Sequence, residues 1–566
     1  MAERKLLAVS LFFSFFLAFS HLAKGKDLYV DNVVGNDSYS GLSPKVEGKQ
    51  GPLATITRAL RMAEPGDTVH LIPTGQLYRQ MADFYGLKGG QPGKPLILDG
   101  HGATLSGAEV CPADGWKEWK DGLVAREDLV SHVFLLVDGK MVFVTRNVDC
   151  LQPGEICFSP EEANRLHFWL PAGKKIEEFS FEVGQPDGRC VQLEPGGWKV
   201  ASSTNPALRR YDGLKNPVWV KINGEPVSLV LAKERLKPGQ WCQESKVMYY
   251  KVPAGKKLED LKIEAIVRPN GVQMGGETAY VVVRNLKVQH VYNDGFNIHG
   301  HVTHAEFYNC DARECGDEGF SAHDACETVL DGATYEYCDN GIANVNEKGF
   351  SITRNVIIAH SRSVGFLIQG KAYHQLSCAI FINNPTQISA GNTKGEDILI
   401  INTPASGLKN IRAIACYGPS SFSRVTTIGH GPGQSFFVSA DTSLALSDCL
   451  FTETEAVFHC RLEDPFSALK LKNVWVGPEQ KIEWSAHYPW KRLSFKEWFP
   501  EAEKRQVAES CGTGLQDWTA SFLQGRLPEK ISPETGCSLT LMKKYLEYWA
   551  THNPLPGKSQ SQSSGV

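Results

Sequence analysis

Acidic side chains gather before two glycines that lie one repeat apart. Asp294 directly precedes Gly295, and Asp317 and Glu318 directly precede Gly319. If the two segments stack like neighbouring strands, about 4.8 Å apart, the acids repel one another, so that one keeps a proton while another ionises. Glycoside hydrolysis needs this division, with a protonated acid at the leaving oxygen and a base or nucleophile about 5 to 9.5 Å away. Asp294, Asp317 and Glu318 are therefore candidate catalytic residues.

Two histidines follow the same glycines at equal distance. His299 and His323 each lie four residues after their glycine, and the alternation of a strand would point both outward together with Asn297. Stacked segments would make the two imidazoles neighbours beside the acids, so we add His299 and His323 to the catalytic candidates. The candidates for substrate binding surround these groups: Asn297, His301, Asp324, Asp339 and Lys348.

Two other interpretations of the same residues stay open. In a polysaccharide lyase acting by β-elimination, Asp317, Glu318 and Asp339 would hold calcium against a uronate carboxylate, with His323, Arg313 or Lys348 as the base. In a non-catalytic carbohydrate-binding or structural protein, the aspartates would be turn residues that tolerate tight backbone geometry before glycine. The outer face has no basic column comparable to the acidic one, which favours hydrolysis over elimination.

The sequence carries no metal signature of defined spacing. His299, His301, His323 and Asp324 offer zinc ligands, but their spacing matches no zinc motif. The loop at 31–41 is rich in oxygen donors suited to calcium, although turn chemistry also explains Asp, Asn and Gly there. We therefore expect no cofactor and no metal, with calcium as the exception to test.

The elements that must position these residues are repeated. Gly295, Gly319, Gly341 and Gly365 recur at intervals of 24, 22 and 24 residues, between short apolar β segments. Repeats of this length without helical periodicity are typical of a solenoid, in which each coil buries apolar side chains against its neighbours. Asparagines ten residues before three of the glycines predict a ladder of amide side chains at one turn: Asn285, Asn309 and Asn355.

The chain divides into six predicted segments. A basic start and a short apolar run predict a signal peptide at 1–25, and hence a secreted or periplasmic protein. An N-terminal cap and first coils (26–107) precede an inserted β module (108–275), in which Leu151-Gln-Pro-Gly-Glu-Ile-Cys157 recurs as Leu236-Lys-Pro-Gly-Gln-Trp-Cys242. The main coils (276–480), a helical C-terminal region (481–555) and a disordered tail (556–566) follow.

Composition narrows the classes of partner. The 59 basic and 63 acidic residues give a formal charge of −4, which does not favour nucleic acid. We expect a monomer with a polysaccharide substrate and no membrane contact after removal of the signal. The 15 cysteines are odd in number, so at least one thiol is not paired within the chain.

Several motifs carry a family resemblance. They are Tyr29-Val-Asp-Asn followed by Gly35-Asn-Asp, Gly51-Pro-Leu-Ala-Thr-Ile-Thr-Arg-Ala-Leu60, Pro65-Gly-Asp-Thr-Val69 and the 24-residue coils. Together they resemble the secreted right-handed parallel β-helix proteins of the pectate-lyase-like superfamily, which has carbohydrate-active members. With the patterns above, the expected fold is all-β: a right-handed parallel β-helix (solenoid) with an inserted β-sandwich-like module and a helical C-terminal cap.

The acidic segments carry a narrower resemblance. Asn293-Asp294-Gly295 and Gly316-Asp317-Glu318 resemble the Asn-Thr-Asp-Gly and Gly-Asp-Asp segments of the polygalacturonase-like hydrolases, without the threonine and with glutamate as the second acid. The resemblance implies catalytic roles for Asp294, Asp317 and Glu318 and leaves the sugar open. The expected function is a secreted enzyme that cleaves a polysaccharide, by hydrolysis through paired carboxylates.

Overall fold

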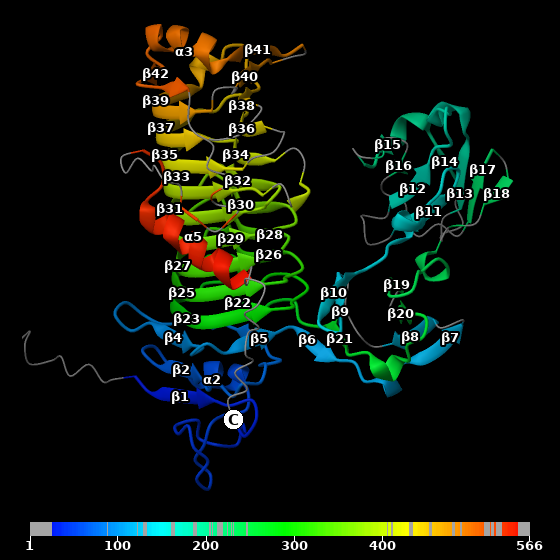
Figure 1. Ribbon diagram of the computed structural model, residues 1–566. Coiled ribbons are helices and arrows are strands. Elements are labelled where there is room, and N and C mark those ends of the chain that lie inside the picture. The colour runs from blue at the N-terminus through cyan, green and yellow to red at the C-terminus, as the bar shows by residue number, and fades with distance from the viewer. Residues whose placement is uncertain are drawn as a thin grey trace, which may run out of the picture. The chain divides into compact units, whose positions relative to one another are not determined.

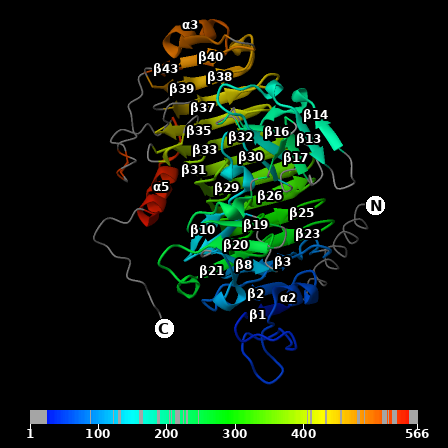
Figure 2. The ribbon, with the colours of Figure 1, turned by 90° about the vertical axis from the view of Figure 1, so that its right-hand side faces the viewer.

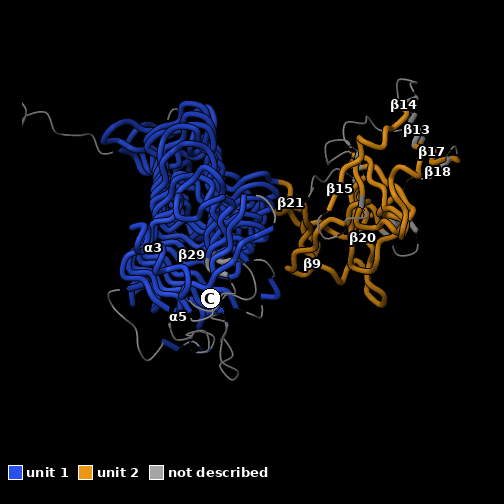
Figure 3. The backbone as a smooth tube through the Cα atoms, turned by 90° about the horizontal axis from the view of Figure 1, so that it is seen from above, with its two compact units in different colours: residues 1–107, 268–566 blue, residues 108–267 orange. Residues whose placement is uncertain are grey.

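The computed structural model describes residues 25–552 with interruptions. The gaps are residue 88 and the segments 121–122, 128–132, 160–164, 185–189, 203–204, 206–207, 212–218, 224, 228, 230, 245–246, 404–405, 409–410, 430–433, 452–455, 478–480, 487–488, 514–520, 522–523, 525 and 528–534. Residues 1–24 of the predicted signal peptide and the predicted tail lie outside the described residues. The chain forms two compact units, residues 1–107 with 268–566, and residues 108–267 (Figure 3).

The first unit is a parallel β-solenoid built on two long sheets (Figure 1). The first sheet follows the order β1 (Asp27–Val30), β2 (Thr68–Leu71), β4 (Leu96–Asp99), β23 (Ala279–Gln289), β25 (Thr303–Arg313), β27 (Glu327–Glu336), β29 (Phe350–Ala359), β31 (Tyr373–Ile382), β33 (Thr393–Ile401), β35 (Ser420–Ile428), β37 (Leu444–Phe451), β39 (Leu469–Val476) and β42 (Ala508–Glu509), with β5 (Thr104–Ser106) beside β23 and β43 (Gly512–Thr513) beside β39.

The second sheet alternates with the first along the chain. Its order is β3 (Ala82–Asp83), β22 (Val272–Met274), β24 (Phe296–Ile298), β26 (Glu318–Asp324), β28 (Asn340–Asn346), β30 (Val364–Gly370), β32 (Thr386–Ala390), β34 (Arg412–Cys416), β36 (Gln434–Val438), β38 (Ala456–Cys460), β40 (Lys481–Trp484) and β41 (Lys491–Ser494). The described pairs are parallel except β40 with β41, so the predicted all-β solenoid is confirmed.

The predicted asparagine ladder forms at a bend in the long strands. Asn285 and Asn309 have φ of 53° and 52°, a left-handed conformation that asparagine tolerates better than most residues. The Nδ2 of Asn309 donates to the Oδ1 of Asn285 at 3.2 Å, and the Nδ2 of Asn355 donates to Asp331 at 2.6 Å. Each amide thus ties a bend to the preceding coil, as the sequence predicts.

The repeated glycines stack on one another. A Cβ atom on Gly295, Gly319 or Gly341 would lie 2.5, 2.6 or 2.6 Å from the carbonyl oxygen of the next glycine in the column. Such distances are too short for a side chain, so only glycine permits this approach of the coils. The column fixes the register, and directly after it the core residues Phe296 and Phe320 stack with ring centroids 6.3 Å apart.

Among the described residues, α-helices cover the solenoid at three places. Near its N-terminal end, α2 (Ile56–Met62) buries Ile56, Ala59 and Leu60. At the other end lies α3 (Phe495–Lys504) (Figure 2). It buries Phe495 and Trp498 in the core that contains Ile482. In contrast to the predicted cap, α5 (Leu539–His552) packs on the outer face of the first sheet, against β31 and β33.

Two predicted boundaries differ from the structure. The inserted unit ends at residue 267 rather than 275, because β22 pairs with β3 and β24 of the solenoid. The region 481–555 is not wholly helical, because β40 to β43 extend both sheets into it. No helix among the described residues is long and apolar enough to cross a membrane. Cys310, Cys315, Cys326 and Cys338 of the coils are free thiols.

The second unit consists of two related halves, each with its own core. One half has two antiparallel sheets, β11 (Ile156–Ser159), β12 (Arg165–Trp169), β16 (Leu208–Tyr211), β15 (Lys199–Val200) and β14 (Cys190–Leu193), β13 (Phe181–Gly184), β17 (Trp219–Ile222), β18 (Glu225–Val227). The other has β19 (Trp241–Glu244), β20 (Val247–Lys251), β8 (Leu123–Glu127), β7 (Lys117–Lys120) and β10 (Lys140–Phe143), β9 (Phe134–Val137), β21 (Ile263–Ile266), β6 (Ala108–Val110). The duplicated sequences supply the equivalent hairpins β11–β12 and β19–β20.

Candidate active site

The three predicted acids meet where the second sheet begins. Asp294 lies in the turn before β24, and Glu318 is the first residue of β26 in the next coil. The amide of Asp317 donates to the carbonyl of Asn293 at 3.0 Å, which aligns the two turns. One carboxylate oxygen from each of Asp294, Asp317 and Glu318 lies within 4.8 Å of the other two. The stacking on which the sequence prediction depends is therefore present.

Asp294 is the innermost of the acids. The residue is 2% exposed, and its carboxylate oxygens accept hydrogen bonds from Asn297 Nδ2 at 2.6 Å and from the amide of Glu318 at 3.1 Å. Burial raises the pKa of Asp294. Its backbone amide is held in turn by the buried Asn270, whose Oδ1 lies at 3.2 Å. Asp294 thus supports Glu318 from beneath and has little surface for a substrate.

Glu318 and Asp317 are partly exposed, and their pKa values lie well above the ordinary values. Burial, and then the neighbouring Asp294, raise the pKa of Glu318 to about 8, while Asn340 Nδ2 donates to Oε1 at 3.0 Å. Burial, followed by the charges of Glu318 and Asp339, raises the pKa of Asp317 to about 7. The cluster therefore retains protons at neutral pH, with the proton held more firmly on Glu318 than on Asp317.

The two histidines stack, as predicted. The rings of His299 and His323 lie 4.5 Å apart between centroids, with 13° between their planes. Burial lowers the pKa of both, and for His299 the second imidazole lowers it further, so both are neutral at pH 7. Asn297 joins this pair to the acids, because its Nδ2 lies 3.1 Å from His299 Nε2 and 2.6 Å from Asp294. In the next coil the register partner of His323 is Val345, so the histidine pair does not continue there.

Three predicted substrate-binding residues have other contacts. His301 is exposed and pairs with Glu277 at 3.1 Å. Asp324, with φ of 73°, accepts a hydrogen bond from the amide of Gly300 at 2.9 Å and so closes a turn. Lys348 is exposed, and its amide lies 3.4 Å from the carbonyl of Asp324. Among the described contacts, none joins these three side chains to the acid cluster.

Asp339 pairs with Arg362, a residue that the sequence patterns did not identify. Its carboxylate lies 3.5 Å from Arg362 Nε. The Arg362 guanidinium also donates to the carbonyls of Cys315 at 3.0 Å and Gly316 at 2.6 Å, in the turn that carries Asp317. Its positive charge lowers the pKa of Asp317 against the other influences. Arg362 reaches back across two coils, which a search for local motifs does not detect; Asn270 was missed for the same reason.

The predicted calcium loop uses its oxygens internally. Asp31 Oδ1 accepts from the amides of Val33 and Val34 at 2.7 and 2.9 Å. Asp37 Oδ1 accepts from the amides of Ala54 and Thr55, both at 2.9 Å. These contacts are those of turn residues. The acid cluster is a second set of oxygen ligands for a cation, but a bound ion would have to displace the protons that its raised pKa values favour.

The comparisons with known proteins found remote similarities only. No family model and no curated protein matches the chain. Solved structures that resemble it include one described as a glycoside hydrolase (TM-score 0.42, 13% identity, covering 86% of this chain and 95% of the other) and the complex of XylC with xylose (0.36, 12%, 82% and 72%). A third is the GH136 lacto-N-biosidase from Eubacterium ramulus (0.33, 8%, 91% and 72%).

Proposed function

We propose that this protein is a carbohydrate-active enzyme that hydrolyses glycosidic bonds of a polysaccharide at Asp294, Asp317 and Glu318. The observation that carries the proposal is the set of carboxylate oxygens within 4.8 Å, in which the pKa is about 8 for Glu318 and about 7 for Asp317. Near pH 7.5 one acid is then protonated while its neighbour is ionised, the state that glycoside hydrolysis requires. The substrate would be met outside the cytoplasm, as the signal pattern predicts.

The proposed roles follow from exposure and charge. Glu318 donates its proton to the glycosidic oxygen as the bond from that oxygen to the anomeric carbon breaks. Asp317 attacks the anomeric carbon and forms a glycosyl ester; water, deprotonated by Glu318, then attacks the same carbon and releases Asp317. Asp294 is a positioning residue, because it is buried and bonded to Asn297 and to the backbone of Glu318. The neutral histidines are suited to hydrogen bonds with sugar hydroxyls.

The separation of the acids favours retention of anomeric configuration. Retaining enzymes place their carboxyl groups about 5 to 5.5 Å apart, whereas inverting enzymes need about 6.5 to 9.5 Å to admit water. Carboxylate oxygens within 4.8 Å leave little room for that water. A 2-deoxy-2-fluoro glycoside should therefore label Asp317, and the mass of the labelled peptide tests it. Label on another residue would reassign the nucleophile.

A polysaccharide screen tests the reaction class. The purified chain is incubated with neutral, acidic and sulfated polysaccharides, and new reducing ends are measured together with absorbance from unsaturated uronates. We expect reducing ends without unsaturation. Unsaturated products would establish elimination instead, and silence across the panel would favour a binding protein.

Matched variants test the site. Glu318→Gln should lower kcat by about 10²–10⁴-fold, the range for loss of a catalytic acid or base, and Asp317→Asn, which removes the nucleophile, should abolish activity. Asp441→Asn is the control, because Asp441 is exposed and asparagine suits its φ of 59°. Full activity in both acid variants would remove the cluster from consideration.

A further inference from the structure

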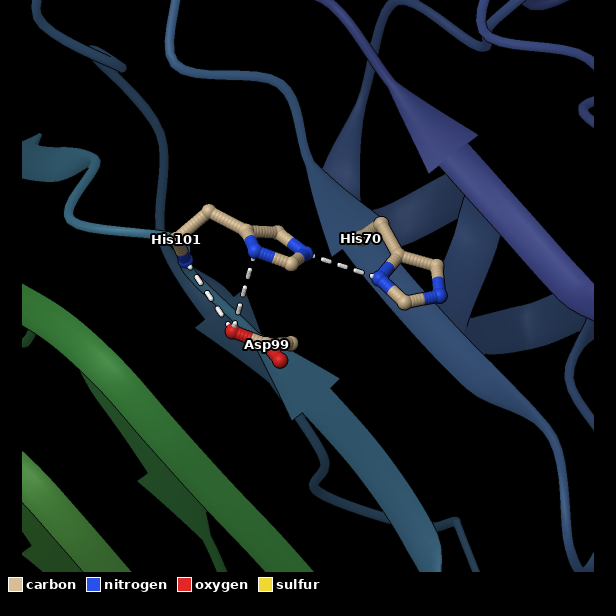
Figure 4. Close-up of side chains that lie close together, drawn as sticks. All are labelled: His70, Asp99 and His101. Carbon is tan, nitrogen blue, oxygen red and sulfur yellow. Dashed lines mark hydrogen bonds and ion pairs between the residues drawn. The ribbon is translucent and has the colours of Figure 1, made fainter.

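A second group of titratable residues, His70, Asp99 and His101, lies in the N-terminal coils of the first sheet (Figure 4). His70 on β2 is the register partner of Asp99, the last residue of β4. His101 follows in the turn after β4, with φ of 49°. One ligand atom from each of the three residues lies within 4.8 Å of the others.

The two imidazoles meet edge to edge. His70 Nδ1 lies 2.9 Å from His101 Nε2, and the ring planes differ by 23°. Figure 4 shows the two nitrogens directed at each other. Tyr29 stacks against His70 at 5.2 Å between centroids, so the orientation of this ring is restrained.

The outer nitrogen of His70 faces a carboxylate. His70 Nε2 lies 3.1 Å from Asp27 Oδ1. Carboxylates accept hydrogen bonds, so His70 carries its proton on Nε2 and presents a lone pair at Nδ1. In metal sites the same pattern fixes the tautomer of a ligating histidine, with the carboxylate bound to the nitrogen that does not touch the metal.

The geometry leaves a defined position for a cation beside the two rings. His70 Nδ1 and His101 Nε2 face each other at 2.9 Å, and Asp99 offers an oxygen within 4.8 Å of a nitrogen of each ring. The local charge also favours a cation, because Arg284, at 2.7 Å from Asp99, balances only one of the two aspartates.

We propose that His70 Nδ1, His101 Nε2 and Asp99 bind a divalent transition-metal ion of the zinc class. Imidazole nitrogens favour zinc and its neighbours over calcium and magnesium. Tetrahedral coordination with Zn–N distances of 2.0–2.1 Å separates two nitrogens by about 3.3 Å. A shift of roughly 0.4 Å by the partly exposed His101 meets this requirement. The ion would join β2 to the turn after β4 and so staple the first coils.

Zinc titration of matched variants tests the proposal. The full chain is treated with a chelator, dialysed, and titrated with zinc chloride by calorimetry at pH 7.5. His101→Asn removes the ligand and keeps a residue suited to positive φ. His304→Asn is the control, because His304 is also exposed, has φ of 53° and lies 3.6 Å from a carboxylate, that of Glu327. We expect His101→Asn to bind one zinc fewer than wild type and His304→Asn to match wild type.

Two further measurements separate a metal site from a simple structural role. Zinc should raise the Tm of wild type by several degrees and leave that of His101→Asn unchanged, since an ion stabilises the state that binds it. Asp27→Asn keeps all three ligands and should weaken zinc binding by about 10-fold or more. Equal zinc stoichiometry in wild type and His101→Asn would overturn the proposal and leave the two imidazoles joined by a hydrogen bond alone.

Discussion

At the scale of single residues, the proposed mechanism predicts activity within a narrow pH window. It requires Asp317 ionised and Glu318 protonated, and their pKa values are about 7 and about 8. We therefore expect kcat/KM to fall below pH 7, as Asp317 gains its proton, and above pH 8, as Glu318 loses its own. The two limbs belong to the coupled pair. A pH profile measured on the best substrate of the screen checks this; a rate still rising at pH 10 would contradict it.

Glu318 also makes the stability of the protein depend on pH in a defined direction. Glu318 has a pKa raised to about 8 in the folded protein, against an ordinary value of 4.5. Between these values the folded state binds more protons, so stability declines as pH rises from about 4.5 to 8. Glu318→Gln removes the ionisation and should raise Tm by a few degrees at pH 9 while changing it little at pH 4. Thermal melts at both pH values test this, and a variant less stable than wild type at pH 9 would contradict it.

At the scale of elements, the glycine column sets the distance between coils. A Cβ on Gly341 would lie 2.6 Å from the carbonyl oxygen of Gly365 and 2.2 Å from Ile358 Cγ2. Gly341→Ala should therefore cost about 1–3 kcal/mol, the usual range for overpacking. Gly196→Ala is the control, because nothing lies within 4 Å of its added Cβ. Denaturant unfolding compares the two, and equal stability would mean that the coils can separate without cost.

At the scale of the whole solenoid, α5 covers apolar side chains on the outer face of the first sheet. Leu541 is 3% exposed and packs in a cluster that includes Ile380 and Leu399, whereas Leu539 on the same helix is 45% exposed. Leu541→Asp should detach α5, lower Tm and increase binding of an apolar dye. Leu539→Asp should change neither. Equal dye binding by the two variants would show that α5 is not needed to cover this face.

Sequence patterns revealed the features that repeat from coil to coil and missed the contacts that individual residues make across coils. The glycine column, the asparagine ladder and the His299–His323 pair recur at a fixed interval, so stacking follows from spacing alone. Arg362 and Asn270 act on other coils through contacts that do not recur from coil to coil, so they leave no periodic trace. The position of α5 was missed because its amphipathic pattern fits the end of a solenoid as well as its flank. The pair of His70 and His101 was missed because 31 residues separate them.

The second unit is inserted in the chain between Gly107 and Arg268, and this insertion has a consequence for folding during synthesis. The amide of Arg268 donates to the carbonyl of Gly107 at 3.2 Å, so the coil closes as though the intervening residues were absent. During translation, however, β4 has no β23 beside it until those 160 residues, 108–267, have emerged, which takes about 8 to 32 s at typical rates. For that time the edge of β4 in the nascent N-terminal coils stays unpaired. The inserted residues have cores of their own and therefore have time to fold first.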